Sequence, residues 1–484
     1  MTTSSTELHS TPHAVHRQSS SFTPSHEEPS VLERRLGPYD AAAVVVSNVI
    51  GSGILFVPAV VALMVPHPMG ILAVWVVGGM LALAGAMAYA ELAALKPRAG
   101  GEYVYLREAF GPLAAFLTGW TSFVAGFSGA IAVAAVGLAA YLGRFIPVAG
   151  DATPLFSLPL GIVTLTVSPQ ALVALTAIVA LTVVHILGIG PGRVVQNLLA
   201  LAKVLALVAF VACGLTFGAG SVEHFAADTT PAPSGMLLAL IPVMFAYSGW
   251  NAASYIAEEI RDPERNVPKA LAIGTLAVVV LYALMNVGYL YALPVSALAE
   301  LTMQSGRVID VAADALFGPR VGDILTIVSL FIMTGTISAM VFAGPRVYFA
   351  MARDGLFLPA AARVHPTRRT PAFSIAAQGV WSGLLVLSGT FQQLLTYTGF
   401  AIMLFAGIAV SGLFVLRRRT PSAQRAFSAW GYPVAPALFV LASAAAVVNA
   451  MWRAPWESLA GVGIISLGIP LYFVMRRLIS ESRG

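Results

Sequence analysis

The stretch SNVIGSGIL, residues 47–55, interrupts the first long apolar run of the chain. Two glycines flank a serine at a place where an uninterrupted membrane helix would carry leucine or alanine. Glycine loses more conformational freedom than any other residue when it is fixed in a helix, so a GSG triplet weakens the helix locally. The stretch therefore predicts a membrane helix that is broken in its middle.

The composition is that of a membrane protein. Apolar residues make up 58% of the 484 residues, charged residues only 10%, and the mean hydropathy is +0.83. Soluble domains carry about 25% charged residues, so a surface with so few charges must face lipid. The apolar runs are too long and continuous for the alternating strands of a barrel, which leaves helices of about 20 residues as the spanning elements.

We expect an all-α integral membrane protein with twelve transmembrane helices. The predicted spans are residues 40–64, 70–95, 112–142, 168–189, 191–217, 235–259, 268–293, 323–353, 372–389, 391–417, 432–452 and 455–476. With the N-terminus inside, the cytoplasmic segments hold 22 of the 27 Lys and Arg residues and the outer segments hold four. This asymmetry obeys the positive-inside rule and predicts a multi-pass protein of the cell (inner or plasma) membrane with both termini cytoplasmic.

Residues 1–36 are predicted to form a disordered cytoplasmic tail. The first 30 residues hold 13 Ser and Thr residues and no apolar core, so they are not a cleaved signal peptide. The tail histidines lack the tight spacing of metal ligands, so no metal site is expected at His9, His13, His16 or His26. Nucleotide-binding and metalloprotease motifs do not occur, and the net charge of +5 follows from the cytoplasmic loops. We therefore expect no cofactor, no nucleic-acid partner and no enzyme activity.

A second weak point lies at FAYSGWN, residues 245–251, inside the predicted sixth helix. Like the first, it places a small flexible pair, Ser248-Gly249, in the middle of an apolar run. Broken helices at corresponding positions of two halves are the best sequence indicator of a transporter binding site. Unwound backbone offers N–H groups that suit a carboxylate and carbonyls that suit an ammonium. The alternative is that these glycines are packing contacts between membrane helices.

Lys203 is the one basic residue that falls inside a predicted membrane helix. A charged side chain there is energetically expensive and indicates function by default. Its ammonium can replace a bound monovalent cation, or, because burial favours the neutral amine, release a proton during a cycle. Snorkelling of the side chain toward the cytoplasmic surface is the alternative. Other charges near the cytoplasmic ends of helices are interpreted as anchors or salt bridges, with gating as an alternative: Glu91, Glu258, Glu259, Arg346 and Arg353.

These features together resemble the amino acid permeases of the amino acid–polyamine–organocation superfamily, and most closely their L-type amino acid transporter branch. The resemblance covers residues 37–480. It is carried by Lys203 and by IGSGIL (50–55), YAELAALKPRAGGEYVYLREAFGP (89–112), FAYSGWNAASYIAEEIRDPERNVPKAL (245–271) and PRVYFAMARDGLFLPAAARVHPTRRTPAFS (345–374). It implies the five-plus-five inverted-repeat fold of the bacterial leucine transporter with two extra helices. The parts would be the tail at 1–36, repeats at 37–234 and 235–420, and helices 11–12 with the C-terminus at 421–484.

The resemblance also implies where an amino acid binds. Its carboxylate would meet the amides around Ser52 and Gly53, and its ammonium would meet carbonyls near Val49, Phe245 and Ser248. Lys203 would stand where sodium-coupled relatives hold a sodium ion, and would bridge the first helix at Gly51 to the eighth through Ser338. The implied substrate-binding residues are Val49, Ile50, Gly51, Ser52, Gly53, Phe245, Ala246, Tyr247, Ser248, Gly249, Trp250 and Asn251, and the coupling residues are Lys203 and Ser338.

We therefore expect a sodium-independent secondary transporter of small or medium neutral L-amino acids that works by alternating access. Exchange and proton-coupled uptake stay open, as do a transporter-like amino acid sensor and a polyamine or cationic amino acid permease. The broken segments contain no acidic residue, so a cationic substrate lacks an obvious counter-charge there. Residues 143–167 contain no cysteine and the single cysteine is Cys213, so no disulfide-linked heavy subunit is expected. The expected partners are free amino acids and the lipid bilayer, and a homo-oligomer stays open.

Overall fold

The computed structural model describes residues 1–2, 34–159, 164–187, 192–226, 232–304, 307–388, 391–422, 424–453 and 455–481. By its contacts the chain divides into two compact units, Met1–Val31 and Leu32–Gly484. Most of the predicted tail, with its four histidines, lies outside the described residues. The predicted division of the remainder into two inverted repeats and a terminal helix pair stays a prediction.

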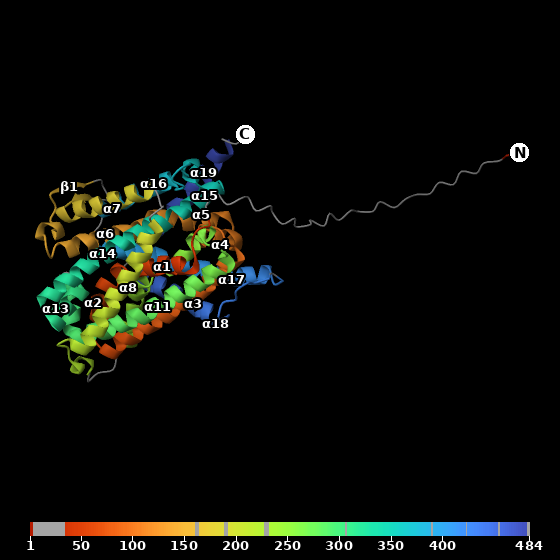
Figure 1. Ribbon diagram of the computed structural model, residues 1–484. Helices are drawn as coiled ribbons and strands as arrows, with labels where there is room; N and C mark the ends of the chain where they lie inside the picture. The colour runs from red at the N-terminus through yellow and green to blue at the C-terminus, as the bar shows by residue number, and fades with distance from the viewer. Residues whose placement is uncertain are drawn as a thin grey trace. The chain divides into compact units, whose positions relative to one another are not determined.

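The described part of the second unit is almost entirely helical (Figure 1). Its α-helices are α1 Pro38–Val49, α2 Ser52–Met64, α3 Pro68–Leu95, α4 Glu102–Phe110, α5 Pro112–Thr121, α6 Phe127–Leu142, α7 Pro169–Leu187, α8 Gly192–Phe217, α9 Pro233–Ala246, α10 Ala252–Tyr255, α11 Pro263–Ala292, α12 Val295–Gln304, α13 Val308–Phe317, α14 Pro319–Ala343, α15 Pro345–Arg353, α16 Ala372–Ser388, α17 Phe391–Arg419, α18 Val434–Arg453 and α19 Pro455–Glu481. A π-helical segment, η1, covers Ser122–Gly126, and 3-10 turns lie at Pro147–Gly150, Val222–Phe225, Ala257–Glu259 and Pro359–Ala362. Two short antiparallel strands, β1 Phe156–Pro159 and β2 Thr164–Val167, pair with Phe156 opposite Val167.

All twelve predicted spans contain helix, but not all of the helices are long enough to cross a bilayer. By length and apolar composition, nine helices of the described residues can cross, or ten if α1 and α2 count as one span bent by 41°. The apolar helices α9 and α16 are shorter, at 14 and 17 residues. The shortness of α9 follows from the second break, because its helix ends at Ala246. A count of twelve crossings therefore stays a prediction.

Several elements between the spans were not predicted. Helix α4 lies between the second and third predicted spans, α12 and α13 lie between the seventh and eighth, and the β1–β2 hairpin precedes α7. The third span was predicted as one helix, but η1 interrupts it between α5 and α6. Single π turns inside helices often mark functional sites, because they turn extra backbone and side chains toward one side.

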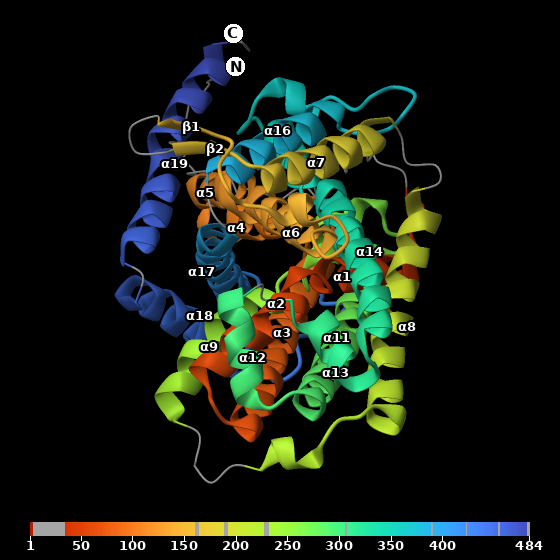
Figure 2. The same ribbon diagram turned by 90° about the vertical axis from the view of Figure 1, so that its left-hand side faces the viewer.

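The first broken helix lies in the interior of the bundle. Helix α1 packs against α8, α11 and α14, and α2 packs against α9 and α12. Figure 2 shows α1 and α2 among these helices, with α18 and α19 at the edge. Only 17–22% of the apolar windows of α7, α18 and α19 are buried, so most of their apolar side chains point outward, where lipid would lie. The break is therefore enclosed by protein rather than exposed to lipid.

The charged residues that the sequence analysis interpreted as anchors or salt bridges form ion pairs. Glu258 binds Arg353 through two hydrogen bonds of 2.8 and 3.0 Å, and Glu259 accepts from Arg346 at 3.0 Å. Glu91 is fully buried and accepts hydrogen bonds from the Arg417 side chain. The interpretation of these residues as salt bridges is confirmed. The Glu258 and Glu259 pairs join the end of the second broken helix to α15, and the Glu91 pair joins α3 to α17.

Replacing Glu258 by Gln is expected to lower the thermal stability of the purified protein in detergent. Removing one partner of a buried ion pair costs about 3–5 kcal/mol, and we expect about 2 kcal/mol here because Arg353 is partly exposed. The exposed Lys96–Glu108 pair provides the control, since Glu108→Gln should change stability by less than about 1 kcal/mol. The exchanged pair Glu258→Arg with Arg353→Glu should recover part of the loss. Equal melting temperatures for Glu258→Gln and the unmodified protein would contradict the expectation.

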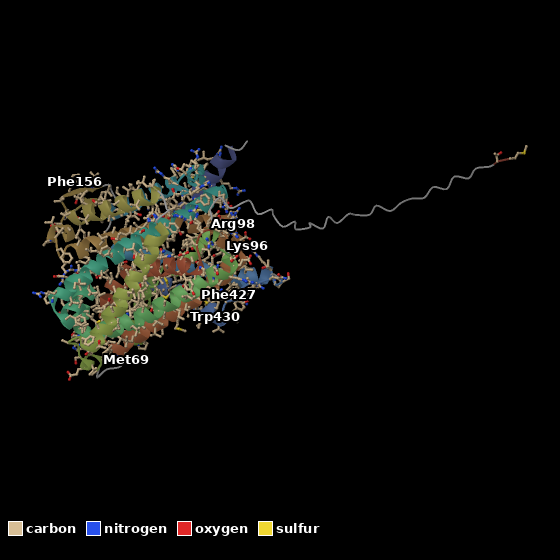
Figure 3. The ribbon with its side chains drawn as sticks, in the orientation of Figure 1. Met69, Lys96, Arg98, Phe156, Phe427 and Trp430 are labelled. Carbon is tan, nitrogen blue, oxygen red and sulfur yellow. The ribbon has the colours of Figure 1, made fainter. Side chains whose placement is uncertain are left out.

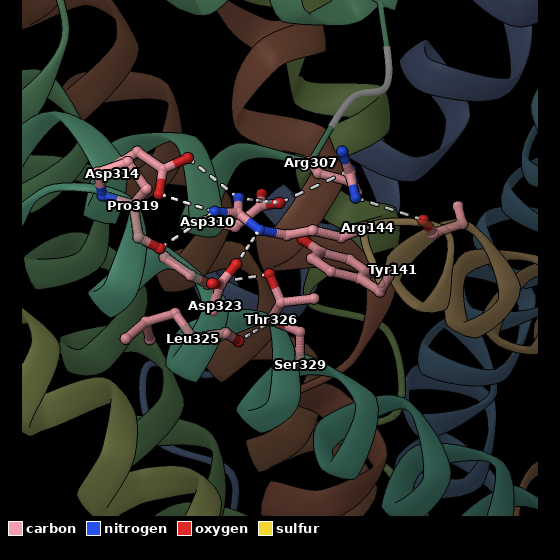
Figure 4. A network of polar contacts seen from close by, with 12 residues as sticks. Tyr141, Arg144, Arg307, Asp310, Asp314, Pro319, Asp323, Leu325, Thr326 and Ser329 are labelled. Atoms are coloured by element: carbon pink, nitrogen blue, oxygen red, sulfur yellow. Dashed lines mark hydrogen bonds and ion pairs between the residues drawn. The ribbon is translucent and has the colours of Figure 1, made fainter. Parts of the chain in front are cut away.

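A second ion-pair network lies at the opposite end of α14 (Figure 4). Arg144 follows α6 and donates to Asp314 at 2.9 and 3.0 Å, to Asp323 at 2.7 Å and to Asp310 at 3.4 Å. Hydrogen bonding to Asp314 raises the pKa of Arg144, and burial raises the pKa of the Asp310 carboxyl. Because a helix rises 1.5 Å per residue, the 25 residues of α14 separate this network from the Arg346 end by about 38 Å. The network joins α6, α13 and α14 on the side of the molecule away from α4 and α15.

Candidate functional site

The two broken helices meet at their breaks. A Cβ atom on Gly53 would lie 2.5 Å from the Cα of Ala246, so only glycine allows α2 and the end of α9 to approach this closely. Gly249 has a φ of +97°, which favours glycine, and a Cβ there would lie 3.0 Å from the backbone of Asn48. Each break therefore packs against the other through a glycine, and the glycines serve both the break and the close packing.

The first break leaves backbone groups available in a cavity. Helix α1 ends at Val49 and α2 begins at Ser52, with Ile50 in an extended conformation and Gly51 as an N-cap that makes no side-chain hydrogen bond. The first N–H groups of α2 therefore lack helical partners, which makes its N-terminus suited to a carboxylate. A small cavity lies at this point, and predicted site residues line much of it: Val49, Gly51, Ser52, Gly53, Phe245, Ala246 and Ser248.

Lys203 contacts the first break directly. Its Nζ donates to the carbonyl oxygens of Ser47 at 3.3 Å and Ile50 at 3.2 Å, and lies 3.2 Å from the Thr336 hydroxyl. The Thr336 hydroxyl also lies 2.8 Å from the Ile50 carbonyl. The Lys203 side chain is 2% exposed, so it does not snorkel to the surface. The ammonium therefore joins α8, the end of α1 and α14 at the point where α1 loses its helical hydrogen bonds.

The residue that α14 provides to Lys203 is Thr336 and not the predicted Ser338. The Ser338 hydroxyl instead lies 2.9 Å from Nε2 of His185 on α7. Residues two apart on a helix point about 200° around its axis from one another, so Thr336 and Ser338 cannot both face Lys203. The prediction chose the correct helix and the wrong face.

Three predicted residues lie at the breaks but point away from the cavities. The Ile50 side chain is fully buried, and only its carbonyl takes part, through Lys203. The Tyr247 hydroxyl donates to the carbonyl of Trp75 at 3.1 Å. Trp250 packs edge-on against Tyr89, with ring centroids 4.9 Å apart. Tyr247 and Trp250 thus brace the second break from behind.

Some predicted ligand groups already have partners within the protein. The Val49 carbonyl accepts a hydrogen bond from the Tyr282 hydroxyl at 2.7 Å, and the Phe245 carbonyl accepts from the Ser248 N–H at 2.9 Å. A carbonyl has two lone pairs, so either oxygen can accept a second donor. Phe245 also lines the small cavity.

A larger cavity adjoins the small one, and several of its polar residues were not predicted. The two cavities share Asn48, Ala130, Ser248 and Met340. The space between the atoms of the larger one is about 640 Å³, including open solvent. Predicted residues on its wall are Ser248, Gly249 and Asn251, and unpredicted polar ones are Asn48, Tyr89, Glu102, Thr121, Ser122 and Tyr255. Glu102 gave no usable sequence signal, because it lies outside the predicted spans among the charged residues Lys96, Arg98 and Arg107.

The environment of Glu102 is unusual for an acidic residue. It begins α4 and is 6% exposed, and its Oε1 accepts from the Ser122 hydroxyl at 3.4 Å. Burial raises the pKa of the Glu102 carboxyl to about 7, while hydrogen bonding from the Tyr255 and Ser122 hydroxyls acts in the opposite direction. The carboxyl can therefore exist in either protonation state near neutral pH.

The family of the chain follows from comparison with known proteins. The family model described as amino acid permease matches residues 36–474. The chain belongs to the amino acid permease family. The permease is 30% identical over 451 residues to the mouse b(0,+)-type amino acid transporter 1, covering 92% of this chain and 88% of the relative. It is 28% identical to a serine/threonine exchanger of Bacillus subtilis (strain 168), covering 93% and 99%.

The relatives also identify the branch. The permease is 29% identical over 454 residues to the human large neutral amino acids transporter small subunit 2, covering 92% of this chain and 80% of the relative. The predicted place in the L-type branch of the amino acid–polyamine–organocation superfamily is thereby confirmed. The permease is a multi-pass membrane transporter of amino acids and not an enzyme.

Proposed function

We propose that the permease is a sodium-independent secondary transporter of small or medium neutral L-amino acids. The observation that carries this proposal is the contact of Lys203 Nζ with the Ser47 and Ile50 carbonyls and the Thr336 hydroxyl. Unwound backbone carbonyls beside a broken helix are the groups that bind a coupling cation in transporters of this architecture. A resident ammonium supplies the same positive charge, so no sodium ion is needed there.

The substrate binds where the two breaks meet. The amide groups of Ser52 and Gly53 at the start of α2 receive its carboxylate, and its ammonium meets carbonyls near Val49, Phe245 and Ser248. The side chain then points toward the larger cavity, whose walls include the small or apolar residues Gly249, Ala130, Met340 and Phe405 beside the polar ones named above. Such walls suit neutral side chains. One of the relatives is named a serine/threonine exchanger, which supports a small neutral substrate.

We infer that the structure corresponds to an inward-facing state. Figure 3 places Lys96, Arg98, Phe427 and Trp430 on one side and Met69 and Phe156 on the other. The positive-inside rule assigns the side with Lys96 and Arg98 to the cytoplasm, together with both termini. The larger cavity includes Glu102 of α4 and Tyr255 of α10, which belong to that side. The Arg144 network joins helices at the other end, which supports a closed outer path.

Substrate flux tests the proposal and separates it from a sensor. The full-length permease would be reconstituted in liposomes, with radiolabelled alanine, serine, leucine or lysine outside and no sodium present. We expect serine and alanine uptake that does not increase when sodium is added. Uptake that needs internal amino acid would indicate exchange, and uptake into empty vesicles driven by an inward proton gradient would indicate proton coupling. Saturable binding without flux would leave only the sensor, and uptake that requires sodium would contradict the role of Lys203.

A further inference from the structure

Glu102 differs from the other buried acidic residues of the described chain. Those others are Glu91, Glu258 and Asp310, and each pairs with arginine. Glu102 has no such partner, and its Oε2 makes no hydrogen bond within the part of the chain that the structure describes. A buried carboxylate without a counter-charge is strongly disfavoured, so this carboxyl must bind a positive charge.

Among the residues that the structure describes, the groups around Glu102 offer hydroxyls but no cation. Tyr89 of α3, Tyr105 of α4, Tyr255 of α10 and Tyr348 of α15 are the titratable groups that interact with it. Segment η1 adds Ser122, and the Tyr255 hydroxyl is itself bound by the Asn251 amide at 2.8 Å. The cavity walls from α6, α14 and α17 are apolar at Phe127, Ala130, Met340, Ala401, Ile402, Phe405 and Ala406. The positive charge must therefore arrive through the cavity.

We propose that Glu102 is a proton-binding site of the transport cycle, holding a proton on its carboxyl in the inward-facing state. The inference deepens the proposed function and rests on it, because the proton is exchanged with the solution that reaches the cavity. A proton from water adds to a carboxylate oxygen of Glu102 when the cavity is open to the solution. The same proton returns to water in the state of the cycle that exposes the ionised carboxylate to solvent. Glu102 thus takes the role of proton carrier, which the sequence analysis gave as one possibility for Lys203. The Lys203 ammonium is instead held by three oxygen atoms.

Two further observations agree with a proton on Glu102. The carboxyl shares the larger cavity with Asn48, Ser248 and Gly249 of the two breaks, so its charge acts on the same space as the substrate. Its raised pKa, about 7, lies where cellular pH can change its state. Protonation would therefore respond to both substrate and pH.

Infrared difference spectroscopy of the full-length permease in lipid nanodiscs tests proton binding without any need for flux. A protonated carboxyl has a carbonyl stretching band that disappears on ionisation. We expect a band that is lost with a midpoint at about pH 7 and that is absent from Glu102→Gln. Glu108→Gln, on the exposed side of the same helix, should retain it. A folded Glu102→Gln protein that keeps the full band would overturn the proposal.

The pH dependence of serine uptake tests whether this proton matters for transport. The unmodified permease should lose about tenfold in initial rate for each pH unit above about 7, because the ionised carboxyl destabilises the open cavity. Glu102→Gln stays neutral and should show a flat profile, whereas Glu108→Gln should keep the original one. If Glu102→Gln does not fold, Glu102→Asp should shift the infrared midpoint instead, and an unshifted midpoint would refute the assignment.

The experiments also separate failure of this inference from failure of the proposed function. Absence of flux in the unmodified permease would contradict transport, while the infrared band would still report proton binding. Loss of the band on adding lysine but not serine would mean that the lysine side chain pairs with the ionised Glu102 carboxylate. Glu102 would then be a binding site for a cationic amino acid and not for a proton.

Discussion

Replacing Lys203 by alanine is expected to reduce amino acid flux at least tenfold in sodium-free buffer. The substitution removes the donor from the Ser47 and Ile50 carbonyls, which are buried at the end of α1. The Ile50 carbonyl keeps the Thr336 hydroxyl at 2.8 Å, but the Ser47 carbonyl loses its side-chain donor. A buried acceptor left without a partner costs about 1–3 kcal/mol, and about 1.4 kcal/mol corresponds to a factor of ten in rate. The end of α1 should therefore lose the position that the binding of substrate requires.

The variant also tests whether Lys203 stands in for a cation. Lys203→Ala leaves empty space lined by two carbonyls and the Thr336 hydroxyl, so added sodium should restore part of the flux. Lys203→Met fills the same space without a donor, and sodium should not restore it. Lys96→Ala, at an exposed lysine, is the control and should transport normally. Sodium-free flux in a folded Lys203→Ala protein equal to that of the unmodified permease would show that Lys203 has no coupling role.

The sequence predicted the parts of the site that depend on local backbone chemistry. Small residues in the middle of apolar runs identified both breaks, and a single charge in an apolar helix identified Lys203, because both signals need only neighbouring residues. The sequence did not predict which side chains of other helices meet them. Thr336 and Ser338 are equally polar and lie on one helix, so the choice between them depends on the rotation of α14.

Glu102 illustrates a second limit of the sequence. It lies outside the predicted spans, near Lys96, Arg98 and Arg107, so its pattern is that of an exposed loop. Its burial arises because α4 packs against α5, which follows it directly in the sequence, and against α17, which lies far from it in the sequence. The count of spans has a similar limit, because a broken helix such as α9 is shorter than the apolar run that contains it.

Replacing Gly53 by alanine is expected to abolish substrate binding and flux. The new Cβ would lie 2.5 Å from the Cα of Ala246 and 3.0 Å from its carbonyl oxygen, and backbone atoms cannot move aside as a flexible side chain can. The start of α2 and the end of α9 must therefore separate. Overpacking of this kind costs about 1–3 kcal/mol, and here the strain falls on the two segments that bind the amino acid.

Two further substitutions separate this effect from a general loss of helix stability. Gly463→Ala in α19 places its Cβ in open space, so it should leave flux unchanged and stabilise the helix by up to about 1 kcal/mol. Adding Ala246→Gly to Gly53→Ala removes a contact of 2.8 Å between side chains but leaves the shorter contact with the Cα. The double variant should therefore stay inactive, as measured by serine binding and uptake in liposomes. Normal uptake by Gly53→Ala would mean that the two breaks do not need this close approach, and the binding site would have to lie elsewhere.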